Sequence, residues 1–166
     1  MSLELVRKHL NKLFLDTAPG AAAPVFTRVK TSTDFAVAMN GETETKDFIA
    51  DENPSDDLKS YKPSIAQTQT AYIGDPVYDY IFSLYEKQAV GTEAITKCLI
   101  VYQQEKEVGE TKEHIAQLFD VLITIDTYDL VAQTITYTLS QRGTPAHGTA
   151  TLDEDGKPVF NAEVAV

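Results

Sequence analysis

The sequence predicts a mainly β fold, a β-sandwich or barrel of about seven to eight strands with one flanking α-helix and an N-terminal helical arm. Three observations support this fold class. Short segments rich in β-branched residues alternate with turn signals such as Asn40-Gly41 and Asp155-Gly156. A single Asp75-Pro76 step opens a run with the apolar spacing of a helix. Hydrophobic residues make up 43% of the 166 residues, which is enough for one globular core.

The N-terminal segment has the spacing of an amphipathic helix over residues 3–14. The apolar stripe of this predicted helix consists of Leu3, Val6, Leu10, Leu13 and Phe14. Residues 16–24, DTAPGAAAP, have the composition of a linker. We therefore divide the chain into a helical arm with its linker, 1–24, and a β domain, 25–166. Because so short a helix is marginal in water, we expect it to dock on its own body or on a neighbouring subunit.

Two strands are expected at 25–30 and 35–39, and Asn40-Gly41 predicts a hairpin that joins the second of them to a polar strand at 42–49. Residues 50–63 are rich in acids and contain two prolines, so they are expected to form a long loop. The loop acids do not have the spacing of a calcium-binding EF-hand. These acids are Asp51, Glu52, Asp56 and Asp57.

The clearest local signal is Gly74-Asp75-Pro76. The Asp75 carboxylate can cap free backbone N–H groups, and Pro76 suits the first helical position. A helix of about a dozen residues should follow, pack on a sheet and stop near Gly91.

The C-terminal half reads as strands. We expect strands at 92–104, 115–126 and 132–140, a charged turn at 105–113, a break at Gly143 and Pro145, and a closing hairpin of 147–152 with 157–164 around Asp153–Gly156. Residues 132–140 alternate most cleanly. Ile135, Tyr137 and Leu139 should face the core, with the threonines between them on a wet face.

Charge is distributed unevenly along this acidic chain, whose formal net charge is −11. Residues 1–30 hold five basic and two acidic side chains, a net +3, whereas residues 31–166 hold nine basic and 23 acidic ones, a net −14. The main body should therefore repel nucleic acid rather than bind it.

No motif points to catalysis, and we expect no catalytic, cofactor or metal site. Cys98 lies in an apolar run and should be buried and inert. The histidines His9, His114 and His147 fall in three different elements. Asp126 and Asp129 flank a strand end, where acids that form turns are far commoner than acid–base pairs. No run is long enough for a membrane helix, and the N-terminus lacks a signal-peptide pattern, so we expect a protein of the cytoplasm or of a particle assembled there.

The order of these elements resembles the major tail tube proteins of long, flexible-tailed (siphovirus-type) bacteriophages. The segment YKPSIAQTQTAYIGDPVYDYIFSLYEKQAVG leads a polar strand through Asp-Pro into an amphipathic helix, and the strand EAITKCLIVYQ follows. The end, TITYTLSQRGTPAHGTATLDEDGKPVF, gives a strand, a turn and a closing hairpin. The resemblance covers roughly residues 25–160.

This resemblance implies a subunit of the virion tail, assembled in the host bacterial cytoplasm. Its copies would form stacked hexameric rings whose acidic lumen conducts DNA during ejection. Its partners would be other copies of itself, the tape-measure protein and tail-end proteins, with no membrane and no cofactor. The interface candidates are the N-terminal stripe Leu3, Val6, Leu10, Leu13 and Phe14 and the loop acids Asp51, Glu52, Asp56 and Asp57. The lumen candidates are Glu42, Glu44, Thr134, Thr136 and Thr138.

Three alternatives stay open. The chain is also compatible with a tail terminator or a secretion-type tube protein of related fold. A monomeric β-sandwich module that binds carbohydrate or protein is a different class, and an enzyme with a site invisible to motifs ranks last. Open sheet edges would separate these classes, because a monomer must blunt its edges whereas a ring subunit can pair them with the next copy.

Overall fold

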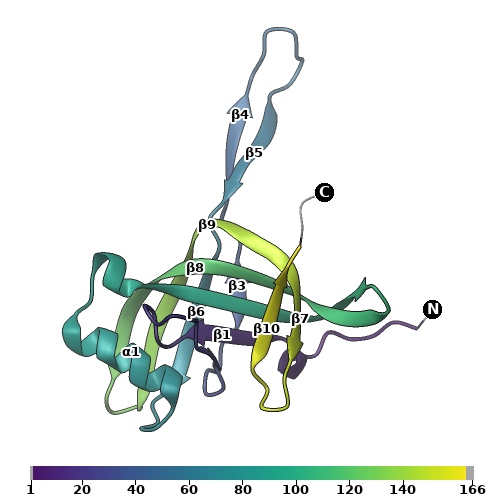
Figure 1. Cartoon of the computed structure of the whole chain (residues 1–166). Coiled ribbons are helices and arrows are strands. Elements are labelled where there is room, and N and C mark those ends of the chain that lie inside the picture. Colours follow the sequence, from purple (N-terminus) through teal and green to yellow (C-terminus); the bar gives the residue numbers. More distant parts are fainter. Residues whose placement is uncertain (1, 164–166) are drawn as a thin grey trace.

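The computed structural model describes residues 2–163 and is mainly β, with a single α-helix in that range, which confirms the predicted fold class (Figure 1). Met1 and Val164–Val166 lie outside the described residues, and so does the end of the strand expected at 157–164. The strands are β1 (Lys12–Asp16), β2 (Phe26–Arg28), β3 (Ala36–Ala38), β4 (Gly41–Lys46), β5 (Ser55–Tyr61), β6 (Ser64–Thr70), β7 (Ile95–Val108), β8 (Thr111–Asp129), β9 (Thr134–Leu152) and β10 (Pro158–Ala162). The helices are α1 (Pro76–Lys87) and the short 3₁₀ turns η1 (Lys8–Leu10) and η2 (Gly91–Ala94).

Eight strands form one antiparallel sheet in the order β2-β1-β7-β8-β9-β6-β3, with β10 paired to β9. The remaining two, β4 and β5, pair only with each other. Figure 1 shows this second pair projecting away from the body, while α1 packs at one end of the large sheet.

The strand β9 was expected to end at Gly143 and Pro145 but continues through both. The pairing of Leu118 with Ala146 is followed by that of Asp120 with Arg142, so the bulge at 143–145 absorbs the extra residues. Gly143 supplies the left-handed backbone (φ 68°) of this bulge, and Pro145 needs no ladder N–H there. The bend allows β9 to pair with β6 along 134–140 and with β10 along 148–152.

Apolar side chains fill both faces of the sheet. The larger cluster lies between the sheet and α1 and includes Ile81, Ile100 and Tyr137. The smaller cluster lies on the opposite face, around Leu99 and Ala150. Successive residues of β7 point into different clusters, as the two-residue period of a strand requires.

The helix α1 begins as predicted. The Asp75 carboxylate accepts the Val77 N–H at 3.1 Å, and Pro76 is the first helical residue. The same carboxylate accepts the Thr31 hydroxyl at 2.8 Å and the Gln69 amide at 3.3 Å, and the Tyr137 hydroxyl donates to Gln69 at 2.8 Å. This buried network ties the helix start to β6 and β9. The helix ends at Gln88, in left-handed conformation, rather than at Gly91.

The predicted helix over 3–14 is wrong. Residues 12–16 form β1, which pairs with both β2 and β7 inside the main sheet. Leu13 (2% exposed) points into the larger cluster and Phe14 (1%) into the smaller one. A strand inside a two-sided sheet buries consecutive residues on opposite faces, whereas a helix docked on a surface buries one stripe. Pairing with β2 and β7 therefore overrides the helical spacing of the sequence.

The hairpin predicted at Asn40-Gly41 is also wrong. The strand β3 pairs with β6, and β4 pairs with β5. Asn40 instead marks the passage from one sheet to the other: it has φ 49°, and its side-chain amide donates to the Lys62 carbonyl and to the Ser64 hydroxyl oxygen, each at 3.0 Å. The expected long loop 50–63 accordingly contains β5.

Substitution at the N-terminus tests this correction. We expect Leu13→Ala to lower the free energy of unfolding by about 2–5 kcal/mol, because it removes a fully packed side chain. We expect Leu3→Ala, a change at a fully exposed side chain, to stay within about 0.5 kcal/mol of the wild type. Urea unfolding followed by circular dichroism measures both values. Equal effects of the two variants would contradict the strand assignment.

Candidate assembly interface

The hairpin β4–β5 is the most unusual surface of the molecule. Every residue of β5 is exposed, and so is every residue of β4 except its last. Two ion pairs join its strands, Lys46–Asp57 at 2.9 Å and Lys59–Glu44 at 3.7 Å. A third, Lys62–Glu42 at 3.5 Å, lies at its base. A lone two-stranded hairpin in water is marginally stable at best, so a projection of this kind would be stabilised by a surface to dock on.

The hairpin brings together two sets of residues that the sequence predicted for different surfaces. Asp51 and Glu52 lie in its tip, and Asp56 and Asp57 lie on β5. The lumen candidates Glu42 and Glu44 lie opposite them on β4, with Glu44 paired to Asp57 across the ladder. All six carboxylates therefore belong to one projecting element. The acids at 56 and 57 are engaged within it, since Asp56 accepts the Thr45 hydroxyl at 2.6 Å and Asp57 binds Lys46.

The three threonines predicted for the lumen lie elsewhere, on β9 of the main sheet. Ile135, Tyr137 and Leu139 are fully buried beneath them, which confirms the predicted alternation. The wet face is continuous with neighbouring polar residues of β6 and β8. The candidates Thr134, Thr136 and Thr138 are half-buried, with Thr136 donating to the Thr127 carbonyl at 3.2 Å and Thr138 to the Asp126 carboxylate at 2.9 Å.

The N-terminal candidates are not brought together into a stripe. Leu3 and Val6 are exposed in the extended segment before η1, and Leu10 is half-buried. Leu13 and Phe14 belong to the two opposite cores. The last two are therefore structural core residues.

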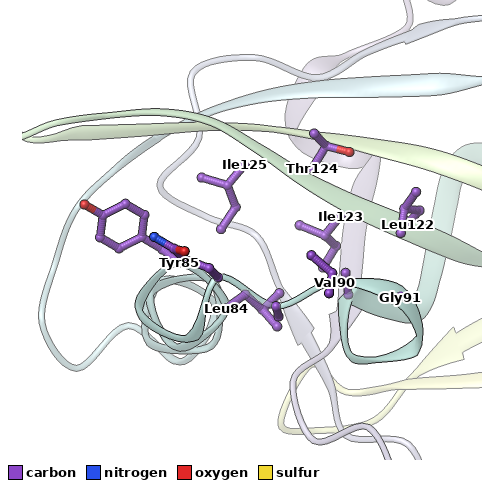
Figure 2. Close-up of a pocket in the computed structure, with 11 residues that line it drawn as sticks. Leu84, Tyr85, Val90, Gly91, Leu122, Ile123, Thr124 and Ile125 are labelled. Atoms are coloured by element: carbon purple, nitrogen blue, oxygen red, sulfur yellow. The ribbon is translucent and has the colours of Figure 1, made fainter.

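A groove of about 460 Å³ lies between the end of α1 and β8 (Figure 2). Figure 2 shows Leu84 on α1 and Ile123 on β8 extending into the space between the two elements, with Val90 beside them. Of the residues that line it, none is an acid, a lysine, an arginine or a histidine. The groove can accept an apolar side chain but has no charged group for acid–base chemistry.

Aromatic rings fix α1 against β8 beside this groove. Tyr85 meets Tyr128 edge-on with ring centroids 5.2 Å apart, and the hydroxyls of Tyr78 and Tyr128 are hydrogen-bonded at 2.7 Å. Burial, and then this hydrogen bond, raises the pKa of Tyr78 to about 12. These tyrosines thus serve packing.

A cleft of about 700 Å³ on another side of the molecule was not foreseen from the sequence. It is formed by η1, by the segment that runs from β2 to β3, and by the middle of β6. The cations Lys8, Arg28 and Lys30 line it. Their separation along the chain hid the site, although the positive balance of residues 1–30 was a signal for it.

The groups usually associated with catalysis are apart or inert. Cys98 is fully buried, as predicted, and burial raises the pKa of its thiol far above the ordinary value. Among residues 2–163 no three His, Cys, Asp or Glu side chains cluster as metal ligands. No helix of the described chain combines the length and apolar character of a membrane span.

Comparison with known proteins shows a shared fold at low sequence identity. No protein-family model and no curated protein matches the chain. A chain in the structure of the anti-feeding prophage cap, described as the tube-terminating cap, matches with a TM-score of 0.51 at 9% identity, over 90% of this chain and 95% of that one. A chain of the anti-feeding prophage baseplate matches with a TM-score of 0.46 at 10% identity, over 89% and 97%. The first likeness establishes a shared fold.

Tyrosine ionisation gives a pH test of the α1–β8 contact. The pKa of Tyr78 is higher in the folded than in the unfolded state. Its contribution to the free energy of unfolding is therefore complete below about pH 10 and is lost as the pH rises toward 12. We expect Tyr78→Phe to make the free energy of unfolding less steep in this window. Part of the slope should remain, because burial also raises the pKa of Tyr137.

The control is Tyr72→Phe, at an exposed tyrosine outside the cluster, which should keep the wild-type slope. Urea titrations at several alkaline pH values give the slopes. A Tyr78→Phe profile parallel to that of the wild type would contradict the assignment.

Proposed function

We propose that this chain is a structural subunit of a phage-tail-like particle, whose copies form hexameric rings stacked into a tube that conducts DNA during ejection. The observation that carries the proposal is the exposed hairpin β4–β5, which has no body of its own to rest on. The fold shared with a chain of a tube-terminating cap supports this role. In a stack, the next ring supplies the surface that the hairpin lacks.

Ring closure requires a lateral contact, and the free edges of the main sheet provide one. The terminal strands β2 and β3 each have one partner among the described strands. An edge strand has unpaired backbone groups on its outer side, and a monomer usually protects them. In the proposed ring, the edge of one copy pairs with its neighbour.

The threonine face of β9 suits a channel wall. Hydroxyl groups at Thr134, Thr136 and Thr138, with Asp126 beside them, are polar and carry no positive charge. DNA gains affinity for a protein mainly when cationic side chains neutralise its phosphates and release their counterions into solution, and these three threonines bring no cation. We assign it to the lumen, where passing DNA should not adhere. The tape-measure protein would occupy the same channel before ejection, tail-end proteins would close it, and assembly would take place in the host cytoplasm.

The proposal includes no catalytic activity. The rings of His114 and His147 are hydrogen-bonded to a backbone carbonyl and to a side-chain amide, the thiol is buried, and no charged residue lines the groove of Figure 2. The architecture is that of a scaffold.

A tube terminator is the second candidate, because the shared fold comes from a structure described as a tube-terminating cap. The two roles differ in stacking. A tube subunit stacks on itself without limit, whereas a terminator forms rings that do not polymerise.

Deletion of the hairpin separates folding from assembly. Gly41 and Tyr61 face each other at its base, so residues 42–60 can be replaced by the two-residue turn Asn-Gly. We expect the shortened protein to keep a mainly-β circular dichroism spectrum and the wild-type melting temperature, because the hairpin contributes no residue to either core. We expect it to lose stacking in negative-stain images over a concentration series, while the wild type forms annuli and filaments.

Wild-type protein that stays a monomer at high concentration would overturn the proposed function in favour of a binding module. Annuli that never stack would favour the terminator. Unchanged filaments of the shortened protein would remove the hairpin from the stacking contact.

A further inference from the structure

We propose that the cationic cleft beside η1 and β2 receives the acidic tip of the β4–β5 hairpin from a second copy of this chain. The proposal rests on the proposed function, in that it identifies the contact through which copies stack. It concerns two surfaces of the same protein, the cationic cleft and the hairpin tip, which is the segment 47–54 between β4 and β5.

The cleft is a local reversal of charge on an acidic protein. Lys8, Arg28 and Lys30 line it, together with the ring of His9, against one carboxylate, Asp34. None of the five ion pairs formed by residues 2–163 includes these three cations. Arg28 donates to the His9 carbonyl at 3.1 Å, which holds its guanidinium at the cleft wall. The cleft therefore has positive charge without a partner.

The floor of the cleft has an acceptor without a donor. Gln67 is 1% exposed, and its side-chain carbonyl oxygen has no hydrogen-bond partner among the described residues. An unpaired buried polar atom of this kind is unfavourable. A ligand with both a hydrogen-bond donor and negative charge complements these groups. A polypeptide has both, in its backbone N–H groups and its carboxylates, so an acidic peptide segment fits better than an inorganic anion.

The hairpin tip has the matching chemistry. Its sequence, DFIADENP, holds three acids and no basic residue, a net −3. The ion pairs within the hairpin join residues of β4 to residues of β5 and to Lys62, and they leave the tip acids Asp47, Asp51 and Glu52 unpaired. The Asn53 amide is one available donor.

The apolar parts of the two surfaces also correspond. Phe48 and Ile49 are exposed at the tip, the second of them fully. In the cleft, Phe35 is 39% exposed and Val29 is half-buried. Burial of such side chains against each other removes apolar surface from water and is favourable, and the charges set the orientation.

The two surfaces lie toward opposite ends of β3 and β6, so the hairpin tip of one copy cannot reach the cleft of the same copy. The chain passes from the end of β3 directly into the hairpin, and Ser64 at the start of β6 pairs with the last residue of β3. The cleft residues precede β3 and contact β6 farther along, where Thr33 N–H donates to the Thr68 carbonyl at 2.9 Å. Figure 1 shows the hairpin pointing away from the part of the body that contains β1. A contact between different surfaces of identical copies that does not close on itself generates an open stack.

Charge reversal with mixing tests the contact. The tip variant is Asp51→Lys with Glu52→Lys, and the cleft variant is Lys8→Glu with Lys30→Glu, all at exposed side chains. Each variant alone presents like charges at the contact, and we expect the concentration needed for stacking to rise by at least about tenfold. In an equimolar mixture each tip meets a cleft of opposite charge, so filaments should return near the wild-type concentration.

The matched control is Glu86→Lys with Glu93→Lys, which changes the net charge as the tip variant does, at exposed positions on α1 and η2. It should stack like the wild type. Circular dichroism melting checks the fold of each variant. If a double variant fails to fold, the single changes Glu52→Lys and Lys30→Glu replace it, with the same mixing scheme.

Variants that stack alone at the wild-type concentration would overturn the proposal while leaving the proposed function intact. A folded pair that fails to stack when mixed would do the same. Wild-type protein that does not stack at all would overturn the proposed function, and this contact with it. Light scattering and negative-stain imaging distinguish the three results.

Discussion

The antiparallel pairing of β8 with β9 is the constraint on which the rest of the structure depends. It runs from His114 opposite Ala150 to Asp129 opposite Thr134, and β7, β6 and β10 all add to its two strands. Because β9 bends at its bulge, the same strand lies over the α1-side core in one half and over the second core in the other. A straight β9 would leave one of the two cores uncovered. Gly148 shows how tight this arrangement is, since a Cβ there would lie 2.1 Å from the Asn161 carbonyl oxygen of β10.

Sequence reasoning succeeded where local chemistry decides the structure. The cap at Asp75 depends on a carboxylate beside free N–H groups, and the alternation along 134–140 depends on one wet and one dry face, so both are visible in a short window. It failed where distant pairing decides. The strand around Phe14 is set by β7, more than 80 residues away, and the spacing from Leu3 to Leu13 imitates a helix by coincidence. The Asn40-Gly41 turn signal lies where the chain crosses from one sheet to the other. No local pattern distinguishes such a crossing from a hairpin.

The candidate surfaces divide in the same way. The acids at 51, 52, 56 and 57 were expected at a contact because the resemblance to tail tube proteins implied one there, and the structure gathers them on one projection. The cationic cleft was missed because η1, the segment after β2, and Gln67 on β6 come together only through the sheet order. The positive balance of the first 30 residues indicated that cations were concentrated in this part of the chain, but the predicted arm separated Lys8 from Arg28 and Lys30.

An acidic protein that assembles with itself must solve an electrostatic problem, and the unequal placement of charge is a physical solution. Bodies with a net charge of −11 repel each other, but at physiological salt that repulsion is screened beyond about 8 Å, whereas groups in contact are screened much less. An orientation that sets acid against acid therefore stays unfavourable at contact. Tip against cleft brings opposite charges together, and it is a head-to-tail orientation. The acidity that would let DNA pass without adhering would then also fix the head-to-tail direction of the stack. Most other contacts between copies would set acid against acid and be repulsive.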